Sequence, residues 1–360
     1  MRVVKIVVLP GDGIGPEVTR EAVECLALIG QKCEIAFVFQ EHDFGGIAID
    51  RHGRPLPPAT LAACQAADAV LLGAVGGPQW DAAHERPEHG LLALRTALGL
   101  FANLRPARVV PGLEGYSPLR PEIAAGADVL VVRELTGGIY FGAKTATDDA
   151  ASDLCVYTVE EVRRIAHVAF RAARARRGKL TSVDKANVLA TSKLWRRTVD
   201  ALAPSYPDVA VDHMYVDAAA MALVTHPTRF DVILTENMFG DILSDEMSVI
   251  AGSIGLMGSA SSGSGGPSLF EPIHGSAPDI AGQDIANPAG AIASAVMLLE
   301  ERGLAETAQL LGQALEQTLV AGTRTRDLGG SSGCAAFGAR VRAVLGALID
   351  DTAVPMKRSA

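Results

Sequence analysis

The chain has 360 residues, 49% of them hydrophobic and 20% charged, and a formal net charge of −9 at pH 7. This composition supplies ample apolar material for a folded core and excludes a disordered protein. The negative charge argues against a nucleic-acid or anionic-membrane surface, because such surfaces favour clustered lysine and arginine.

The cysteines and the apolar runs bound the cellular context. There are five cysteines, an odd number, and none of them form a C-x-x-C pair. Neither a disulfide framework nor a structural zinc site is therefore expected, and a reducing cytoplasm is the expected location. The apolar run at residues 3–9 is too short for a signal sequence, and no later run is long enough to span a membrane.

Short β-branched runs alternate with longer amphipathic segments along the chain. Strands are predicted at residues 3–9, 69–72, 128–132, 180–183, 209–215 and 231–234. Helix-period apolar positions predict helices at residues 159–177, 189–202, 242–251, 288–301 and 305–320. This alternation predicts an α/β protein with a largely parallel sheet. The low-complexity stretch at residues 259–268 is predicted to be a flexible connecting loop.

The first motif, residues 11–16 (GDGIGP), follows the first strand and opens a helix. It looks like a dinucleotide-binding fingerprint, but that fingerprint requires glycine or alanine where this chain has Pro16. An ordinary Rossmann site is therefore not expected here. The alternative is a tight glycine turn with Pro16 in the first turn of a helix, where its missing N–H costs little.

Three arginines are attached to apolar segments: Arg95, Arg105 and Arg133. An arginine that ends a buried strand is costly unless it is paired, so each one alone favours a structural salt bridge, for example to Glu134 or a neighbouring aspartate. Together they predict a carboxylate clamp, because the guanidinium fork binds that group bidentately. Ligands of open α/β sheets also bind beyond the carboxyl ends of the strands.

Asp241 and Asp245 are four residues apart at the start of an apolar-patterned helix, so they share one face. Like charges at this spacing destabilise a helix by roughly 0.2–0.5 kcal/mol. Two explanations stay open: the helix dipole offsets the charge, or the carboxylates hold Mg²⁺ or Mn²⁺. Asp217, directly after the strand predicted to end at Tyr215, is a third candidate ligand.

Six ordered segments closely resemble the motifs of the β-decarboxylating dehydrogenases, the isocitrate/isopropylmalate dehydrogenase family: residues 11–17 (GDGIGPE), 99–106 (GLFANLRP), 133–142 (RELTGGIYFG), 183–187 (VDKAN), 237–246 (NMFGDILSDE) and 271–282 (EPIHGSAPDIAG). The resemblance runs from about residue 3 to about residue 345. It implies a homodimer of two-domain α/β subunits without a Rossmann fold. A discontinuous cofactor-binding domain would comprise residues 1–100 and 255–360, and residues 101–254 would form the substrate, metal and dimerisation domain.

The resemblance assigns roles to the residues singled out above. Arg95, Arg105 and Arg133 would bind substrate carboxylates, and the metal would be held by Asp241, Asp245 and Asp217, the last of which would also contact the substrate. By the same resemblance, the general base for the substrate 2-hydroxyl would be Lys185, and Tyr140 would protonate the enol after loss of carbon dioxide. Lys185 and Asp217 would reach the site of the other subunit, so a monomer would be inactive. As isolated residues, Lys185 and Tyr140 would be interpreted as a surface lysine and a core tyrosine.

The resemblance also places the cofactor contacts in the second half of the chain. They would come from Glu271, His274, Gly275, Ser276, Ala277, Pro278, Asp279, Ile280 and Asn287. Asp279 favours NAD, because a carboxylate accepts hydrogen bonds from ribose hydroxyls and repels a 2′-phosphate. NADP-using relatives typically place lysine and tyrosine at the positions of Asp279 and Ile280.

Substrate choice would depend on Glu88, Leu91 and Leu92, which the resemblance places at the pocket for the C3 substituent. In a helix, Leu91 and Leu92 share the side of Arg95. Two leucines suit an isopropyl group, whereas isocitrate-type relatives use serine or asparagine there. The expected substrate is 3-isopropylmalate, in leucine biosynthesis; ordinary core leucines are the alternative interpretation.

The chain departs from the family pattern at a few places. Ala218 replaces a usual asparagine, Gln283 and Asp284 replace a common Lys-Gly, and residues 144–155 show little family pattern. Homoisocitrate, tartrate, isocitrate or another alkylmalate therefore stays open as the substrate. A non-catalytic regulatory subunit is a further alternative, although such relatives typically lose metal-ligand or acid/base residues that this chain keeps.

Overall fold

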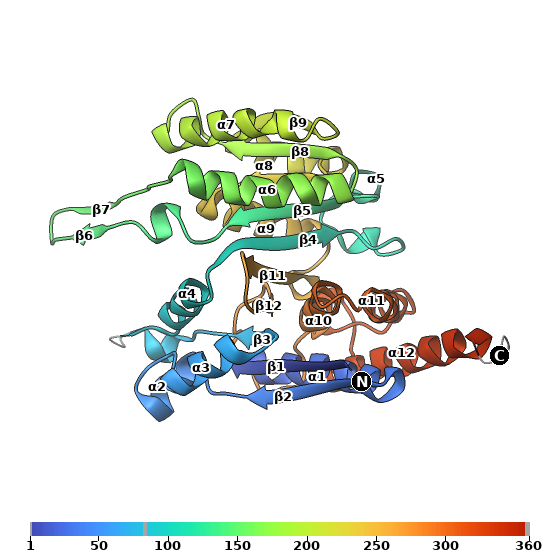
Figure 1. Ribbon diagram of the computed structural model, residues 1–360. Coiled ribbons are helices and arrows are strands. Elements are labelled where there is room, and N and C mark those ends of the chain that lie inside the picture. The colour runs from blue at the N-terminus through green and yellow to red at the C-terminus, as the bar shows by residue number, and fades with distance from the viewer. Residues whose placement is uncertain (1, 82–84, 357–360) are drawn as a thin grey trace. The chain divides into compact units, whose positions relative to one another are not determined.

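The computed structural model describes residues 2–81 and 85–356, so residues 1, 82–84 and 357–360 of the predicted cofactor-binding domain lie outside the described residues. The chain divides into two compact units (Figure 1). The first unit comprises residues 1–99 and 253–360, and the second unit comprises residues 100–252. Each unit contains a mostly parallel sheet with helices packed against it.

The first unit has five strands in the order β2-β1-β3-β12-β11. Their bounds are β1 (Arg2–Gly11), β2 (Ile35–Glu41), β3 (Ala69–Ala74), β11 (Gly258–Gly263) and β12 (Ser268–Pro272). Neighbouring strands are parallel except for β11, which runs antiparallel to β12. The loops that follow β1, β3 and β12 therefore meet at one edge of the sheet, where ligands of α/β sheets bind.

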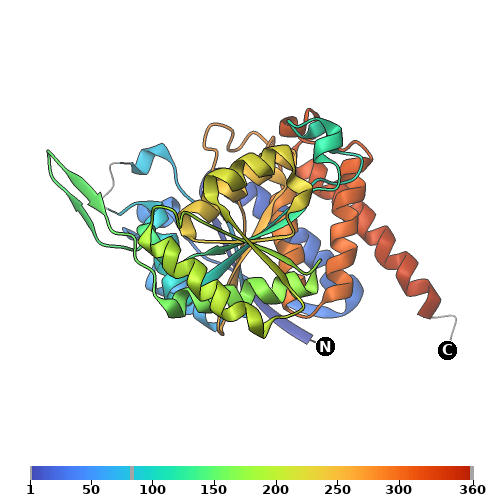
Figure 2. The same ribbon diagram turned by 90° about the horizontal axis from the view of Figure 1, so that it is seen from above.

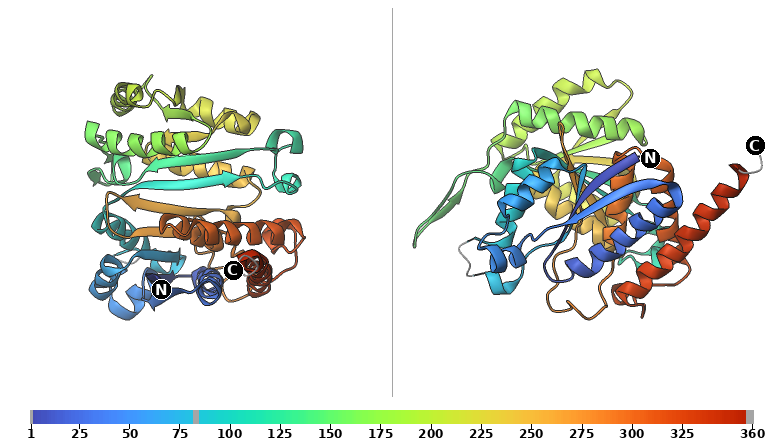
Figure 3. Two further views of the ribbon diagram at one scale, coloured as in Figure 1. Left: turned by 45° about the vertical axis from the view of Figure 1, so that its right-hand side comes forward. Right: turned by 60° about the horizontal axis from the view of Figure 1, so that its bottom comes forward.

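Seven α-helices of the first unit lie among its described residues: α1 (Gly15–Cys33), α2 (Gly46–His52), α3 (Pro58–Ala66), α4 (Pro87–Ala97), α10 (Ala289–Glu301), α11 (Ala305–Val320) and α12 (Cys334–Met356). Helices α10, α11 and α12 pack together with α1, and the short helices α2–α4 lie at the other end of the strands (Figure 3). Within the described residues, every helix is too short or too polar to cross a membrane.

The second unit has the strand order β4-β5-β10-β8-β9. Its strands are β4 (Leu100–Arg108), β5 (Asp128–Glu134), β8 (Lys179–Asp184), β9 (Ala210–Tyr215) and β10 (Val232–Thr235), and β4 is antiparallel to β5 while the others pair in parallel. Helices α6 (Val159–Ala175) and α7 (Ala190–Leu202) cover one face of the sheet, and α8 (Val216–Thr225) and α9 (Asn237–Ile250) cover the other (Figure 2). The main core lies under α6 and α7, where Phe170 and Trp195 are buried.

A hairpin extends away from the body of the second unit in both views (Figures 1 and 2). It is formed by β6 (Lys144–Ala146) and β7 (Ala151–Asp153), whose residues are all exposed. This hairpin is the segment with little family pattern. Its exposure explains the polar, small-residue sequence, because no core imposes an apolar pattern on it.

All six predicted strands and all five predicted helices are present, with shifted ends. The prediction of a flexible loop at residues 259–268 is wrong for its first half, which forms β11. Ser259 and Ser261 of this strand are buried. A Cβ added at Gly258 would lie 2.5 Å from the backbone nitrogen of Ser294 in α10, so the helix packs closely on a strand of small residues.

Candidate active site

Helix α9 carries two of the predicted metal ligands, but it begins at Asn237 and not at residue 242. Its N-cap is Glu236, whose carboxylate accepts a hydrogen bond from the Phe239 N–H at 3.0 Å. Asp241 and Asp245 therefore lie beyond the first turn, where the helix dipole has largely decayed. The structure thus disfavours the dipole as the explanation for these paired carboxylates.

Three predicted site residues of the second unit contact the carboxylate of Asp241. One of its carboxylate oxygens accepts a short hydrogen bond from Arg133 Nη1, and the other accepts one from the Tyr140 hydroxyl at 3.1 Å. Arg133 is the last residue but one of β5 and is 3% exposed. The backbone of α9 can approach it because position 240 is glycine: a Cβ there would lie 2.7 Å from the Arg133 side chain.

Arg105 on β4 faces the same helix. Its Nη1 donates to Ser244 Oγ at 2.7 Å and to Asp245 Oδ1 at 3.0 Å, and it lies 3.5 Å from Asp241 Oδ1. Its Nε donates to Asn103 Oδ1 at 2.8 Å. Glu134 pairs with Arg164, whereas Arg133 pairs with Asp241 of α9, so a salt bridge to an aspartate is present and is compatible with both the structural interpretation and the clamp. Two of the three predicted clamp arginines thus contact the predicted metal ligands of α9: Arg105 contacts Asp241 and Asp245, and Arg133 contacts Asp241.

The site shifts the ionisation of its own acids. Burial, and then the neighbouring Asp241 carboxylate, raise the pKa of Tyr140, so its phenol stays protonated. Burial likewise raises the pKa of Asp245, with the Asp241 charge adding to the effect and Arg105 opposing it. Two carboxylates held close together at the edge of buried arginines form a donor set that suits a hard divalent cation.

Lys185 and Asp217 form a pair of their own. Lys185 follows β8, Asp217 lies in the first turn of α8, and Lys185 Nζ donates to Asp217 Oδ1 at 2.6 Å. This bond lowers the pKa of Asp217, whose side chain is exposed. Across residues 2–81 and 85–356, no hydrogen bond or ion pair joins this pair to Asp241 or Asp245. Among the described residues, the carboxylate oxygens of Asp217, Asp241 and Asp245 do not all lie within 4.8 Å of one another, so one chain does not bring the three predicted ligands together.

Arg95, the third predicted clamp residue, lies on α4 in the first unit. It is 8% exposed, and its Nη2 donates to Glu271 Oε1 at 2.7 Å, which joins it to a residue predicted to contact the cofactor. Its buried Nε has no hydrogen-bond partner. A buried guanidinium nitrogen without an acceptor is costly and is typical of a ligand-binding position.

The glycine motif at residues 11–16 shapes the backbone of the first unit. Gly11 and Gly13 have positive φ angles of 72° and 57°. A Cβ at Gly13 would lie 1.9 Å from the Ser276 carbonyl oxygen, and Ile14 N–H donates to that oxygen at 2.8 Å. Helix α1 follows with Pro16 in its first turn. The motif is therefore a tight turn that packs against the predicted cofactor loop, as its alternative interpretation required.

A cavity of about 810 Å³ opens beside this turn within the first unit. It is lined by His274, Gly275, Ala277, Asp279, Ile280 and Asn287 of the predicted cofactor set. His274 is held neutral because burial lowers its pKa, and its buried Nε2 has no hydrogen-bond partner. Ser276 and Pro278 of that set are not among the lining residues, and Glu271 pairs with Arg95 instead.

Sequence reasoning missed several residues in both places. In the second unit these are Asn103, Ser244 and Asn237, which hold the two arginines. In the first unit, Arg326 and Asp327 line the cavity, and Asp327 accepts a hydrogen bond from Asn287 at 2.9 Å. Asn237 and Ser244 contact arginines that are more than 100 residues away in the chain, which no local spacing signals, whereas Asn103 is two residues from Arg105.

The predicted substrate-selecting residues all lie on α4. Leu91 and Leu92 are half-buried, whereas Leu94 on the same helix is fully buried. Glu88 is also half-buried, and its Oε1 lies close to the Gly76 backbone. Leu94 is therefore the core leucine of this helix, and Leu91 and Leu92 keep surface that a substrate can contact.

A second group of potential metal ligands comprises Glu17, Asp284 and Cys334 in the first unit. Two of these side chains already have structural partners. Asp284 Oδ1 accepts a hydrogen bond from Ala335 N–H at the start of α12, and Glu17 Oε1 accepts one from Gly282 N–H. This group is explained by helix and loop capping.

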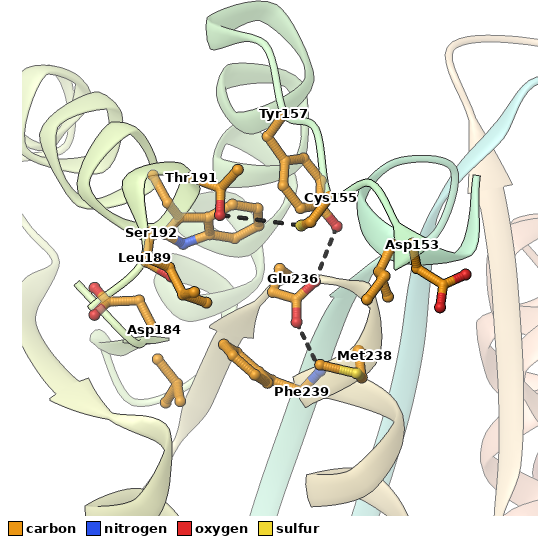
Figure 4. A pocket seen from close by; sticks show the side chains of 13 residues that line it. Asp153, Cys155, Tyr157, Asp184, Leu189, Thr191, Ser192, Glu236, Met238 and Phe239 are labelled. Carbon is orange, nitrogen blue, oxygen red and sulfur yellow. Dashed lines mark hydrogen bonds between the residues drawn. The ribbon is translucent and has the colours of Figure 1, made fainter. Parts of the chain in front are cut away.

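A smaller cavity of about 290 Å³ lies in the second unit next to the start of α9 (Figure 4). It is lined mainly by apolar side chains, including Leu189, Trp195 and Phe239. The cavity is also lined by the carboxyl group of Glu236 at the start of α9. Burial raises the pKa of this carboxyl, and the hydrogen bonds that it accepts from backbone N–H groups partly offset the rise. The cavity thus borders the residue that caps the helix of the site.

Comparison with known proteins agrees with this geometry. The profile of the family described as isocitrate/isopropylmalate dehydrogenase matches residues 5–341. The 3-isopropylmalate dehydrogenase of Anaeromyxobacter dehalogenans is 58% identical, over 91% of this chain and 95% of that protein, and that of Staphylococcus saprophyticus is 55% identical over the same shares.

Solved structures show the same fold. An isocitrate dehydrogenase from Methylococcus capsulatus is 35% identical, with a TM-score of 0.86 over 96% of this chain and 100% of that one. A β-decarboxylating dehydrogenase from Thermococcus kodakarensis is 37% identical, with a TM-score of 0.81 over 97% and 98%. These likenesses confirm the expected two-domain α/β fold. The chain therefore belongs to the isocitrate/isopropylmalate dehydrogenase family.

Proposed function

We propose that this chain catalyses the NAD-dependent oxidative decarboxylation of 3-isopropylmalate to 2-oxo-4-methylpentanoate, in leucine biosynthesis, with Mg²⁺ or Mn²⁺. The observation that carries the proposal is the Asp241 carboxylate, which meets two buried arginines and a phenol. Relatives that are 52–58% identical and carry the name 3-isopropylmalate dehydrogenase support this substrate.

The metal would be held by Asp241 and Asp245 of one chain and Asp217 of a second copy. The observed donor set fits such an ion, because the carboxylates of Asp241 and Asp245 both lie within 3.5 Å of one Arg105 nitrogen. When bound, the cation supplies positive charge beside the substrate 2-oxygen, and NAD supplies the hydride acceptor.

The protein's own groups would bind the substrate and move its protons. Arg95, Arg105 and Arg133 hold the two carboxylates, and Lys185 accepts the 2-hydroxyl proton when hydride leaves C2. The bond from C3 to its carboxylate then breaks and releases carbon dioxide. Tyr140 donates its proton to C3 of the enolate that remains, a role that suits a phenol kept protonated beside Asp241.

NAD would bind in the 810 Å³ cavity of the first unit. Asp279 is exposed and lines this cavity, where its carboxylate can accept hydrogen bonds from the adenosine ribose hydroxyls. A 2′-phosphate at the same place would meet a like charge. The cavity therefore favours NAD over NADP.

Replacing Asp279 by lysine together with Ile280 by tyrosine is expected to lower the ratio of kcat/KM for NAD to that for NADP by about 100-fold or more. The reason is that repulsion of the 2′-phosphate is replaced by attraction. Steady-state kinetics with both cofactors measures the ratio, and Gln283→Lys, which adds a positive charge at an exposed position of the same loop outside the cavity lining, is the control. An unchanged ratio in the double variant would place the ribose elsewhere.

The substrate's isopropyl group would lie against the half-buried Leu91 and Leu92. Apolar contact of this kind is worth about 1–3 kcal/mol, a factor of roughly ten to two hundred. The additional carboxylate of isocitrate would lose hydration against the same leucines and would be repelled by Glu88. A strong preference for 3-isopropylmalate follows.

Leu92→Ser is expected to lower kcat/KM for 3-isopropylmalate by roughly tenfold or more and to lessen the handicap of isocitrate without creating a good isocitrate enzyme. Turnover of 3-isopropylmalate falls because the apolar contact is lost, and isocitrate is less disfavoured because the serine hydroxyl can hydrogen-bond its additional carboxylate. The control is Ala93→Ser, which adds a hydroxyl at an exposed position of the same helix. Equal wild-type kcat/KM on both substrates would disprove the pocket assignment.

We further infer a homodimer whose active sites are shared. The outer sides of α8 and α9 carry exposed apolar side chains: Met221 is 64%, Val224 42%, Ile242 58% and Val249 53% exposed. Several exposed apolar side chains on two neighbouring helices are typical of a subunit interface. The separation of the Lys185–Asp217 pair from Asp241 within one chain supports exchange of this pair across it.

The experiment that tests the function is a parallel assay of NADH formation. Purified protein with Mg²⁺ or Mn²⁺ is given 3-isopropylmalate, isocitrate, homoisocitrate or tartrate, and 3-isopropylmalate is expected to have the highest kcat/KM. If only another of these acids were turned over, the family assignment would stand and the substrate assignment would be wrong. No turnover with any of them would favour a regulatory subunit.

A further inference from the structure

Asn237, the first residue of α9, is completely buried. Its Oδ1 accepts hydrogen bonds from Arg133 Nε at 3.0 Å and from Arg133 Nη2 at 2.8 Å. Its Nδ2 donates to the backbone carbonyls of Leu135 at 3.1 Å and Gly137 at 3.2 Å. The amide oxygen therefore accepts two hydrogen bonds from Arg133, and the amide nitrogen donates two hydrogen bonds to the loop that follows this arginine.

The asparagine amide suits the position because Arg133 needs a hydrogen-bond acceptor there, whereas the backbone carbonyls of Leu135 and Gly137 need a donor. A carboxylate would accept from the guanidinium but would set an oxygen against both carbonyls. An apolar side chain would leave two buried guanidinium N–H groups of Arg133 without the acceptor they have now. Glutamine would add a methylene to a fully packed position.

The backbone of Asn237 is held as closely as its side chain. Its N–H donates to the Tyr157 hydroxyl oxygen at 3.0 Å, and that hydroxyl donates to Glu236 Oε2 at 3.3 Å. Figure 4 shows the Glu236 carboxylate between Tyr157 and the backbone of Phe239. The Tyr157 ring packs edge to face on Trp195, with ring centroids 5.5 Å apart. The start of α9 is therefore a fixed support for the amide.

The loop on the other side of the amide leads to the proposed acid. Glu134, completely buried, accepts hydrogen bonds from the N–H groups of Thr136 at 3.1 Å and Gly137 at 2.8 Å. Tyr140 follows at the end of the short helix Gly138–Tyr140. The same amide thus contacts the residue proposed to bind substrate and the loop that carries the residue proposed to donate a proton.

We propose that Asn237 is a positioning residue: its amide orients the Arg133 guanidinium toward Asp241 and fixes it relative to the loop that carries Tyr140. The proposal rests on the proposed function, because it assigns Arg133 to the substrate. Asn237 touches neither substrate nor cofactor; it acts through Arg133. Its removal should therefore matter only as long as a guanidinium is present to be oriented.

A double-mutant cycle tests this dependence. Asn237→Ala is expected to lower kcat/KM for 3-isopropylmalate by roughly 10- to 100-fold, mostly through KM, with KM for NAD changed less than about twofold. Arg133→Lys has no planar fork to orient, so adding Asn237→Ala to it should cost less than about threefold more. Ser248→Ala is the matched control. It also removes a buried polar group from α9, but the Ser248 hydroxyl donates to a backbone carbonyl and not to an arginine.

The outcomes separate the possible failures. If the two single effects multiply in the double variant, or if folded Asn237→Ala has the wild-type KM, Asn237 is structural only and the inference is overturned. If Asn237→Ala does not fold, Asn237→Ser, which keeps a small polar group, takes its place in the same cycle. Wild-type protein that does not turn over 3-isopropylmalate would overturn the proposed function instead.

Discussion

Asp241→Asn is expected to lower metal-dependent turnover of 3-isopropylmalate by on the order of 10³-fold while the protein stays folded. Asp241 is the group on which the site converges, since it accepts hydrogen bonds from Arg133 and Tyr140 and lies 3.5 Å from Arg105. Asparagine keeps the shape but loses the charge that a cation requires. The Asp241 side chain is 35% exposed, so its replacement does not disturb the core.

The measurement has two parts. NADH formation is followed while Mn²⁺ is titrated, and Mn²⁺ binding is measured separately by electron paramagnetic resonance, which does not depend on turnover. Asp208→Asn is the matched control: it removes a surface carboxylate of the same unit that pairs with Arg174, and its turnover should stay within about twofold of wild type. Near-normal kcat and Mn²⁺ affinity in Asp241→Asn would remove Asp241 from the metal site.

Some of the strands that the sequence predicts are continuous buried runs, although the predicted strand β9 is only partly buried and the buried strand β12 is not among the predictions. Strand β3 is buried along its whole length, and so is β10, and such strands appear as continuous apolar runs. Strand β11 escaped prediction because a helix approaches it too closely for large side chains, so burial there selects glycine, serine and alanine. A pattern of small residues has two physical causes, exposure and close packing, and the sequence alone does not separate them.

The candidate site shows the same division. The charged residues Arg105, Arg133, Asp241 and Asp245 could be grouped from the sequence, because buried arginines and paired carboxylates each need a partner. The side chains that orient them could not. Asn237 is one polar residue at a helix start, where the usual interpretation is a cap, and its role depends on two hydrogen bonds to a strand more than 100 residues earlier in the chain. Such long-range pairing leaves no periodic signal.

The second large effect concerns assembly. Lys185→Ala and Asp241→Asn are each expected to be nearly inactive, but a mixture in which their subunits exchange is expected to recover about a quarter of wild-type activity. In a mixed dimer, one site combines the intact Asp241 of the first chain with the intact Lys185 of the second, and the other site carries both changes. Half of the dimers in an equal mixture are mixed, and each has one working site.

The control for this experiment is a mixture of Asp241→Asn with Asp245→Asn. These two carboxylates contact the same Arg105 nitrogen, so they belong to the same half of the site, and no mixed dimer of these variants contains an intact site. Activity after co-expression with two different affinity tags and purification of the mixed dimer gives the comparison, and the purified Lys185→Ala/Asp241→Asn dimer is expected to have about half of wild-type activity because one of its two sites is intact. If Lys185 and Asp241 instead served one site within a single chain, the Lys185→Ala and Asp241→Asn mixture would stay as inactive as the control, and the exposed apolar side of α8 and α9 would need another partner.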